Sequence, residues 1–110
     1  MFSHEENHKA LLNVEDLMLR LLITDWYLHE QVADCVKNNK FLDVDGIDVL
    51  VKDTSLKTQY VHDIVKTYFS DMTDEQINNG FEYKVRDVPV RIKAFRNQYE
   101  FLNYPNQVVY

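Results

Sequence analysis

The apolar residues change their spacing at Gly80, and this change constrains the fold more than any other feature of the sequence. Before Gly80 most of them recur at the spacing of one helical face. After Gly80 they alternate with polar residues, which is the two-residue period of a strand. Helices are therefore expected mainly before Gly80 and strands mainly after it, a division typical of an α+β fold.

Apolar stripes and capping residues predict three main helices and two short ones. The second helix would begin behind an N-cap at Thr24 or Asp25, and a capping box formed by Thr73 and Gln76 would open the fourth. The expected helices span residues 9–23, 25–38, 55–68, 73–79 and 97–104.

Two stretches predict a small sheet. Residues 47–51 are short and β-branched, which is typical of a strand with both faces buried. Residues 81–95 alternate on both sides of Arg86-Asp87, which predicts a hairpin, and Pro89 must lie at an edge or a strand start. The expected fold class is α+β, with a small mixed or antiparallel sheet (strand 47–51 plus hairpin 81–95) covered by three main helices. A length of 110 residues favours one domain over 1–110.

Residues on the facing sides of these elements are expected to be buried. The set comprises Leu28, Val32, Val36, Val49, Val51, Ile64 and Val65. Cys35 lies on the apolar stripe of the second helix and is expected to be a buried, inert thiol. His29 and His62 are expected at mid-helix positions, exposed or half-buried, without a partner at metal-binding spacing.

Composition excludes several classes of protein. Two glycines exclude a glycine-rich phosphate loop, and a single cysteine excludes a disulfide framework or a thiolate zinc site. No apolar run approaches ~18 residues, so no membrane span is expected. Residues 1–6 are acidic and polar, unlike a signal peptide, and we therefore expect a cytoplasmic protein.

Charge is unevenly distributed along the chain, whose formal net charge is −6. Residues 1–80 carry 7 basic and 15 acidic side chains, whereas residues 81–110 carry 5 and 3. The acidic balance disfavours bulk nucleic-acid binding and could suit a basic partner protein. A local basic strip remains a candidate binding surface. Nucleic-acid binding through the hairpin 84–96 is an alternative function. The strip consists of Lys84, Arg86, Arg91, Lys93 and Arg96.

Residues His4-Glu5-Glu6-Asn7-His8 match the H-E-x-x-H pattern of zinc proteases, in which two histidines on one helical face bind the metal. Such a site also needs a third ligand and a helix held by a core. The motif begins at residue 4, where chain ends commonly fray. We therefore expect His4 and His8 to bind no zinc.

Asp43, Asp45 and Asp48 surround Gly46 and run directly into the strand 47–51. Carboxylates at a strand end can gather Mg²⁺, and metal-dependent phosphoryl transfer is built on such groups. A polar turn that leads into a buried strand would give the same composition.

Residues 45–51, with a helix expected before and after them, resemble the metal-binding strand of minimal nucleotidyltransferase domains. The resemblance covers roughly residues 20–95. It implies that two aspartates two apart on this strand hold a metal ion, and that a third carboxylate stands on a later strand, here 88–93. If Asp48 is the second aspartate, Gly46 is at the place of the first and Arg91 at that of the third carboxylate. The family's glycine turn would fall at Thr24-Asp25.

The same region is also similar to the core of restriction-type nucleases, which carry a D…(E/Q)xK pattern. This second resemblance implies that Asp48 is the metal aspartate and Lys93 the catalytic lysine. Arg91 again takes the place of the acidic residue or glutamine.

Arg91 is a permanent cation that would repel a metal ion, and so we expect catalysis to be impaired or absent. The leading hypothesis is a nucleotidyltransferase-like domain that has no cofactor and acts by binding another protein. A regulator or inhibitor, including one encoded by a phage, would suit such a compact acidic chain. The alternative is a Mg²⁺-dependent nucleotidyltransferase or nuclease that uses Asp43, Asp45, Asp48 and Lys93. We further expect Arg91 or Lys93 to pair with Asp48 or Asp45.

Overall fold

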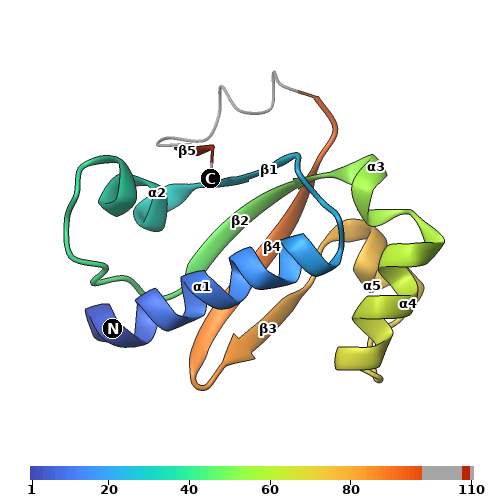
Figure 1. Ribbon diagram of the computed structural model, residues 1–110, viewed down its shortest axis with the longest axis horizontal. Coiled ribbons are helices and arrows are strands. Elements are labelled where there is room, and N and C mark those ends of the chain that lie inside the picture. The colour runs from blue at the N-terminus through green and yellow to red at the C-terminus, as the bar shows by residue number, and fades with distance from the viewer. Residues whose placement is uncertain (98–107, 110) are drawn as a thin grey trace.

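A computed structural model describes residues 1–97, 108 and 109 (Figure 1). The helices and strands are α1 (His4–Arg20), β1 (Trp26–Leu28), α2 (Glu30–Lys37), β2 (Ile47–Lys52), α3 (Asp53–Leu56), α4 (Gln59–Tyr68), α5 (Asp74–Asn79), β3 (Glu82–Val85), β4 (Val88–Phe95) and β5 (Val108–Val109). The strands form one sheet in the order β3-β4-β2-β1-β5. The predicted α+β class with a mixed sheet is confirmed.

The two longest strands, β2 and β4, are parallel, and the other strand pairs are antiparallel. Parallel neighbours need a crossover connection, which α3, α4, α5 and β3 provide here. The β2–β4 register places Asp48 beside Arg91 and Leu50 beside Lys93. This register brings the predicted site residues of both strands together.

Helix α1 crosses in front of the sheet in Figure 1 and supplies one wall of the core. Its apolar side packs with one face of β2 and β4, where alternate residues of each strand point toward it. Buried residues at this contact include Ala10, Val14, Leu17, Val49, Val51, Val90 and Ile92. The opposite face of the sheet therefore carries the other set of side chains, which includes Asp48 and Arg91.

Most of the predicted core is confirmed. Leu28, Val32, Val49, Val51 and Val65 are fully buried. Val36 and Ile64 are only half-buried and pack at the margin of the core, as does Cys35, which the sequence placed inside.

The predicted second helix is wrong at its start, because residues 26–28 form strand β1 and α2 begins at Glu30. Pairing of β1 with β2 buries Trp26 and Leu28 opposite Val51 and Val49, and this packing outweighs the helical spacing.

The predicted helix 55–68 is divided into α3 and α4. The division falls at Lys57-Thr58, where the Thr58 hydroxyl caps α4 by accepting the Val61 N–H at 3.2 Å. The first helix is also longer than predicted, since a capping box of Ser3 and Glu6 starts it at His4.

The turn and hairpin predictions are confirmed. The capping box at Thr73 opens α5, and Gly80 adopts a φ of 100° after it. Arg86 turns the β3–β4 hairpin with a φ of 57°, and Pro89 is the second residue of β4, before its pairing with β2 begins. The helix predicted over 97–104 lies outside the described residues, apart from Asn97. No helix in the described part of the chain is long and apolar enough to cross a membrane.

Asn7, which the sequence did not single out, fixes the loop that precedes β2. Its side chain is fully buried, and its amide Nδ2 donates to three backbone carbonyls. These belong to Leu42 at 2.5 Å, Val44 at 3.1 Å and Phe2 at 3.2 Å. Asn7 thereby holds the loop with the aspartates against α1.

Candidate functional site

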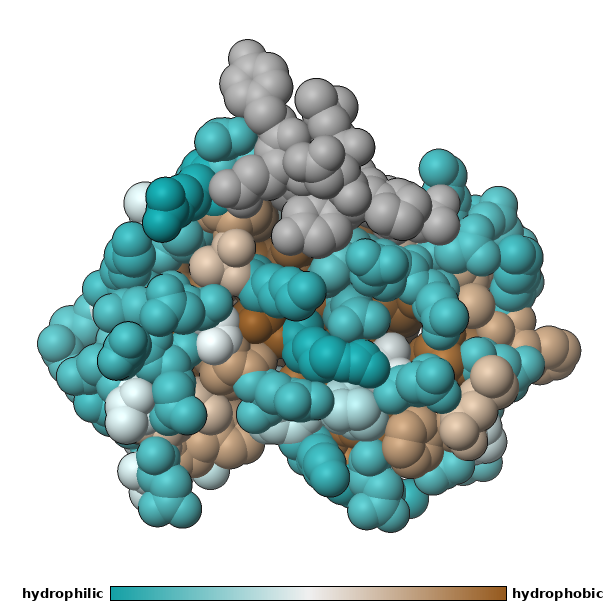
Figure 2. Space-filling model, turned by 180° about the vertical axis from the view of Figure 1, so that it is seen from behind, coloured by the Kyte–Doolittle hydropathy of each residue, from teal (hydrophilic) through white to brown (hydrophobic). Residues whose placement is uncertain are grey.

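The face of the sheet opposite α1 carries half of the predicted site residues: Asp48, Lys84, Arg91 and Lys93. Strand alternation and the β2–β4 and β3–β4 registers place them on one side. We call this surface the charged face: Asp48, Lys52, Glu82, Lys84, Arg91 and Lys93. Figure 2 views the molecule from this side, where hydrophilic side chains predominate and hydrophobic atoms show between them. Leu50 and Phe95 share the face and are buried.

Arg91 and Asp48 pair at the centre of the charged face. Nη1 of Arg91 lies 3.4 Å from Oδ1 of Asp48, and Nη2 donates to the Asp45 carbonyl at 3.3 Å. The two side chains are 33% and 17% exposed, so the pair is partly shielded from water. The predicted pairing of an aspartate with a cation of the hairpin is confirmed.

Gly46 provides the space that this pair needs. A Cβ atom at Gly46 would lie 2.5 Å from Nη2 of Arg91 and 2.8 Å from the Pro89 carbonyl oxygen. Any side chain there would displace the guanidinium from the Asp45 carbonyl. The glycine is thus explained by the close approach of Arg91.

Two of the three aspartates of the metal alternative pair with different cations. The Asp45 carboxylate lies 3.5 Å from the Met1 ammonium group, while Asp48 pairs with Arg91. Within residues 1–97, 108 and 109, no three His, Cys, Asp or Glu side chains are grouped so that they could hold a metal ion. The structure therefore does not bring Asp43, Asp45 and Asp48 together.

His29 lies buried next to Asp48. The backbone N–H of His29 donates to the backbone carbonyl of Asp48 at 3.1 Å. Burial lowers the pKa of His29 to about 4, helped by Lys93 and Arg91, so the imidazole is neutral at pH 7. Burial also raises the pKa of Asp48, although Arg91 opposes this shift.

The predicted exposure of both histidines is wrong, whereas the helical position is wrong for His29 only, since His62 lies in α4. His29 precedes α2 as its N-cap residue and is 1% exposed, because β1 carries it into the interior. His62 is also buried, and its ring contacts Asp74, Asn78 and the Leu56 carbonyl. Next to His29, Glu30 has a φ of 62°, a conformation that costs energy in a non-glycine residue.

The predicted basic strip is split by the fold. Lys84, Arg91 and Lys93 share the charged face, where Glu82 lies between them opposite Arg91. Hydrogen bonds from the backbone and the side chain of Ser3 lower the pKa of Glu6. Arg86, at the hairpin turn, makes a smaller contribution to the same shift. Arg96 follows β4 and accepts a hydrogen bond from Lys52 at its carbonyl.

The H-E-x-x-H segment lies on a formed helix. Nδ1 of His4 accepts the Leu42 N–H at 2.9 Å, and its ring stacks on His8 with centroids 6.0 Å apart. The Phe41 ring packs nearly perpendicular to the His4 ring, with ring centroids 5.2 Å apart. His4 therefore already uses one ring nitrogen to hold the loop before β2.

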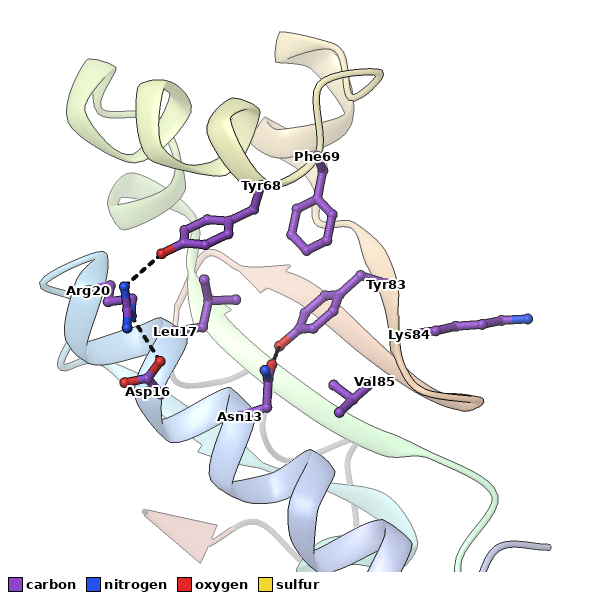
Figure 3. Close-up of a pocket in the computed structure, with 9 residues that line it drawn as sticks. All are labelled: Asn13, Asp16, Leu17, Arg20, Tyr68, Phe69, Tyr83, Lys84 and Val85. Carbon is purple, nitrogen blue, oxygen red and sulfur yellow. Dashed lines mark hydrogen bonds and ion pairs between the residues drawn. The ribbon is translucent and has the colours of Figure 1, made fainter.

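A hollow of about 320 Å³ lies between α1, the C-terminal end of α4 and the face of β3 that is directed toward α1 (Figure 3). Leu17, Phe69 and Val85 make it partly apolar, and the Tyr83 hydroxyl donates to Oδ1 of Asn13 at 2.9 Å within it. Burial raises the pKa of Tyr83. Arg20 bridges Asp16 and the Tyr68 hydroxyl on the rim, each at 2.9 Å.

Comparisons of the chain with protein-family models, curated proteins and solved structures found no match. The sequence pattern predicted Asp48, Arg91 and Lys93 as site residues, but it did not predict the positions of His29 and Glu30 or the role of Gly46. Strand alternation could have placed His29 near Asp48 only if β1 had been recognised.

Proposed function

We propose that this chain is a non-catalytic, cytoplasmic protein-binding domain, nucleotidyltransferase-like in outline. It acts as a regulator or inhibitor by presenting the charged face to an acidic surface of a partner protein. The observation that carries this proposal is the Arg91–Asp48 pair, which places a permanent cation among the aspartates.

The pair argues against metal-dependent phosphoryl transfer. Such chemistry needs carboxylates that converge on a cation, and in relatives with that chemistry a third carboxylate would stand where Arg91 does. Here the guanidinium is bound by Asp48 and by the Asp45 carbonyl, and Gly46 makes room for it. A divalent cation at this place would have to displace a fixed positive charge.

The same geometry suits protein recognition. Arginine is enriched at binding hot spots, and one already held by two contacts loses little conformational entropy when a partner binds. Lys84 and Lys93 are exposed on either side of Arg91. Together they present positive charge that would attract an acidic partner surface.

The acidic residues on and around this face disfavour nucleic acid as the ligand. Glu82 and Asp48 stand between the basic side chains, and the whole chain has a net charge of −6. Nucleic-acid binding depends on neutralising phosphates with lysine and arginine, which nearby carboxylates oppose, whereas a folded protein can match a mixed pattern of charge.

Affinity capture with three forms of the protein tests this proposal. Lys93→Glu reverses one charge on the face, and Lys37→Glu makes the same change at an exposed position on α2. We expect a protein that the wild type and Lys37→Glu both retain and that Lys93→Glu loses, in the presence of nuclease. Identical sets of captured proteins for all three forms, or ligands that nuclease removes, would contradict the proposal.

A further inference from the structure

Strand β3 exposes its outer edge. It lies at the end of the sheet order and pairs with β4 alone among the described strands. The Ile92 N–H donates to the Phe81 carbonyl at 2.8 Å, which fixes the parity of the ladder. Tyr83 and Val85 therefore exchange hydrogen bonds with Val90 and Val88, and the N–H and C=O groups of Glu82 and Lys84 point outward.

The outward groups of Glu82 and Lys84 make no backbone hydrogen bond elsewhere in residues 1–97, 108 and 109. Such an edge is a template for another extended segment. The hollow beside α1 lies along the same edge, with Tyr83 and Val85 directed toward it and Lys84 directed away (Figure 3). Side chains of an added strand would thus find space on the helix side of the sheet.

The charges on β3 specify what the added strand must carry. Glu82 and Lys84 are both exposed, and opposite charges directly across two strands stabilise their pairing. An antiparallel strand centred on Tyr83 should therefore present an acidic residue opposite Lys84 and a basic residue opposite Glu82. Read from its N-terminus, that strand has the pattern acidic–apolar–basic, which is the pattern of Glu82-Tyr83-Lys84 itself.

We propose that two copies of this chain pair through β3 in antiparallel orientation, around a two-fold axis at Tyr83. Glu82 of each copy then lies opposite Lys84 of the other, and the outward backbone groups form about four hydrogen bonds between the copies. An isologous contact of this kind closes on itself and joins the two sheets into one.

The dimer takes Glu82 and Lys84 at the outer edge of β3, whereas Lys93 lies on β4, one strand inward, so that Lys93→Glu tests partner binding without changing the dimer contact. The pairing leaves the central Arg91 and Lys93 on the charged face.

Reversal of single charges tests the pairing by sedimentation equilibrium across a range of protein concentrations. Glu82→Lys places like charges opposite each other at both pairs, and so does Lys84→Glu. We expect the wild type to dimerise and each single variant to raise the dimer Kd at least about tenfold. The double variant Glu82→Lys/Lys84→Glu restores opposite charges and should dimerise again.

An equimolar mixture of the two single variants should also form dimers, because each supplies the charge that the other needs. Glu75→Lys, the same charge change at an exposed position on α5, should leave the dimer Kd unchanged. A monomeric wild type at several hundred micromolar would overturn the proposal. A dimer that neither single variant weakens, or that the double variant does not restore, would overturn it as well.

Discussion

Arg91 lies at the centre of the charged face and pairs there with Asp48. Its guanidinium is held by the Asp48 carboxylate and the Asp45 carbonyl, and it excludes a side chain from position 46. Asp48 is buried enough that its pKa is raised despite this partner. The pair is therefore part of the fold as well as part of the site.

Arg91→Ala should lower the free energy of unfolding by about 1–3 kcal/mol, since it leaves a shielded carboxylate without its partner. Urea denaturation measures the change. Lys93→Ala, on the same strand but exposed, should cost less than about 1 kcal/mol. Equal losses for the two variants would mean that the Arg91–Asp48 pair contributes nothing specific.

His29 should make stability depend on pH. Its pKa is lowered to about 4 in the folded protein from an ordinary value near 6.5, so the unfolded chain binds more protons between these pH values. The His29 contribution, up to about 3 kcal/mol, is present above pH 6.5 and is lost as pH falls toward 4.

Urea denaturation at pH 7, 5.5 and 4 tests this contribution. The His29→Gln variant should lose less stability over the range than the wild type, whereas His8→Gln, at an exposed position, should follow the wild type. Parallel curves for His29→Gln and the wild type would show that folding does not lower the pKa of His29.

Asn7→Ala should cost about 3 kcal/mol, because it removes the buried amide that donates to the Leu42 and Val44 carbonyls. The matched change Asn38→Ala removes an exposed amide that bonds Asp34, and should cost under about 1 kcal/mol. Thermal unfolding of the two variants gives the comparison, and a similar Tm for both would contradict the role assigned to Asn7.

Among the elements, those with strong local signals were predictable from the sequence. The β3–β4 hairpin and α5 carry strict alternation and a capping box, and both are found where expected. Strand β1 was not predictable, because its three residues gain their stability from β2, more than 20 residues away. The break at Thr58 depends on a single side-chain cap within an otherwise continuous helical pattern.

Helix α4 offers a direct check of which side faces the core. Val65 is fully buried and Ile64 is at the margin. Val65→Ala should cost about 2 kcal/mol and Ile64→Ala about 1 kcal/mol, although isoleucine loses more atoms. Urea denaturation of both variants decides the matter, and the reverse order would mean that the helix is rotated about its axis.

At the scale of the whole molecule, the sequence predicted the class of the fold and the residues that meet at the centre of the charged face. Alternation on β4 was sufficient to place Arg91 and Lys93 on one side. The positions of the buried His29 and Asn7 could not be foreseen, since they depend on contacts across the sheet and across a loop. The two-fold character of β3 becomes visible only once its outer edge is known to be exposed.

The central claim of the proposed function is that the fixed cation of Arg91, paired with Asp48, leaves no place for a catalytic metal ion among the aspartates. Thermal unfolding with millimolar Mg²⁺ or Mn²⁺ and a nucleoside triphosphate tests it most directly. A ligand at a hundred times its Kd would add about 2.7 kcal/mol of stability, which is readily measured as a rise in Tm. We expect no saturable rise. A rise that is abolished by Asp48→Ala and retained by Asp16→Ala would contradict the claim.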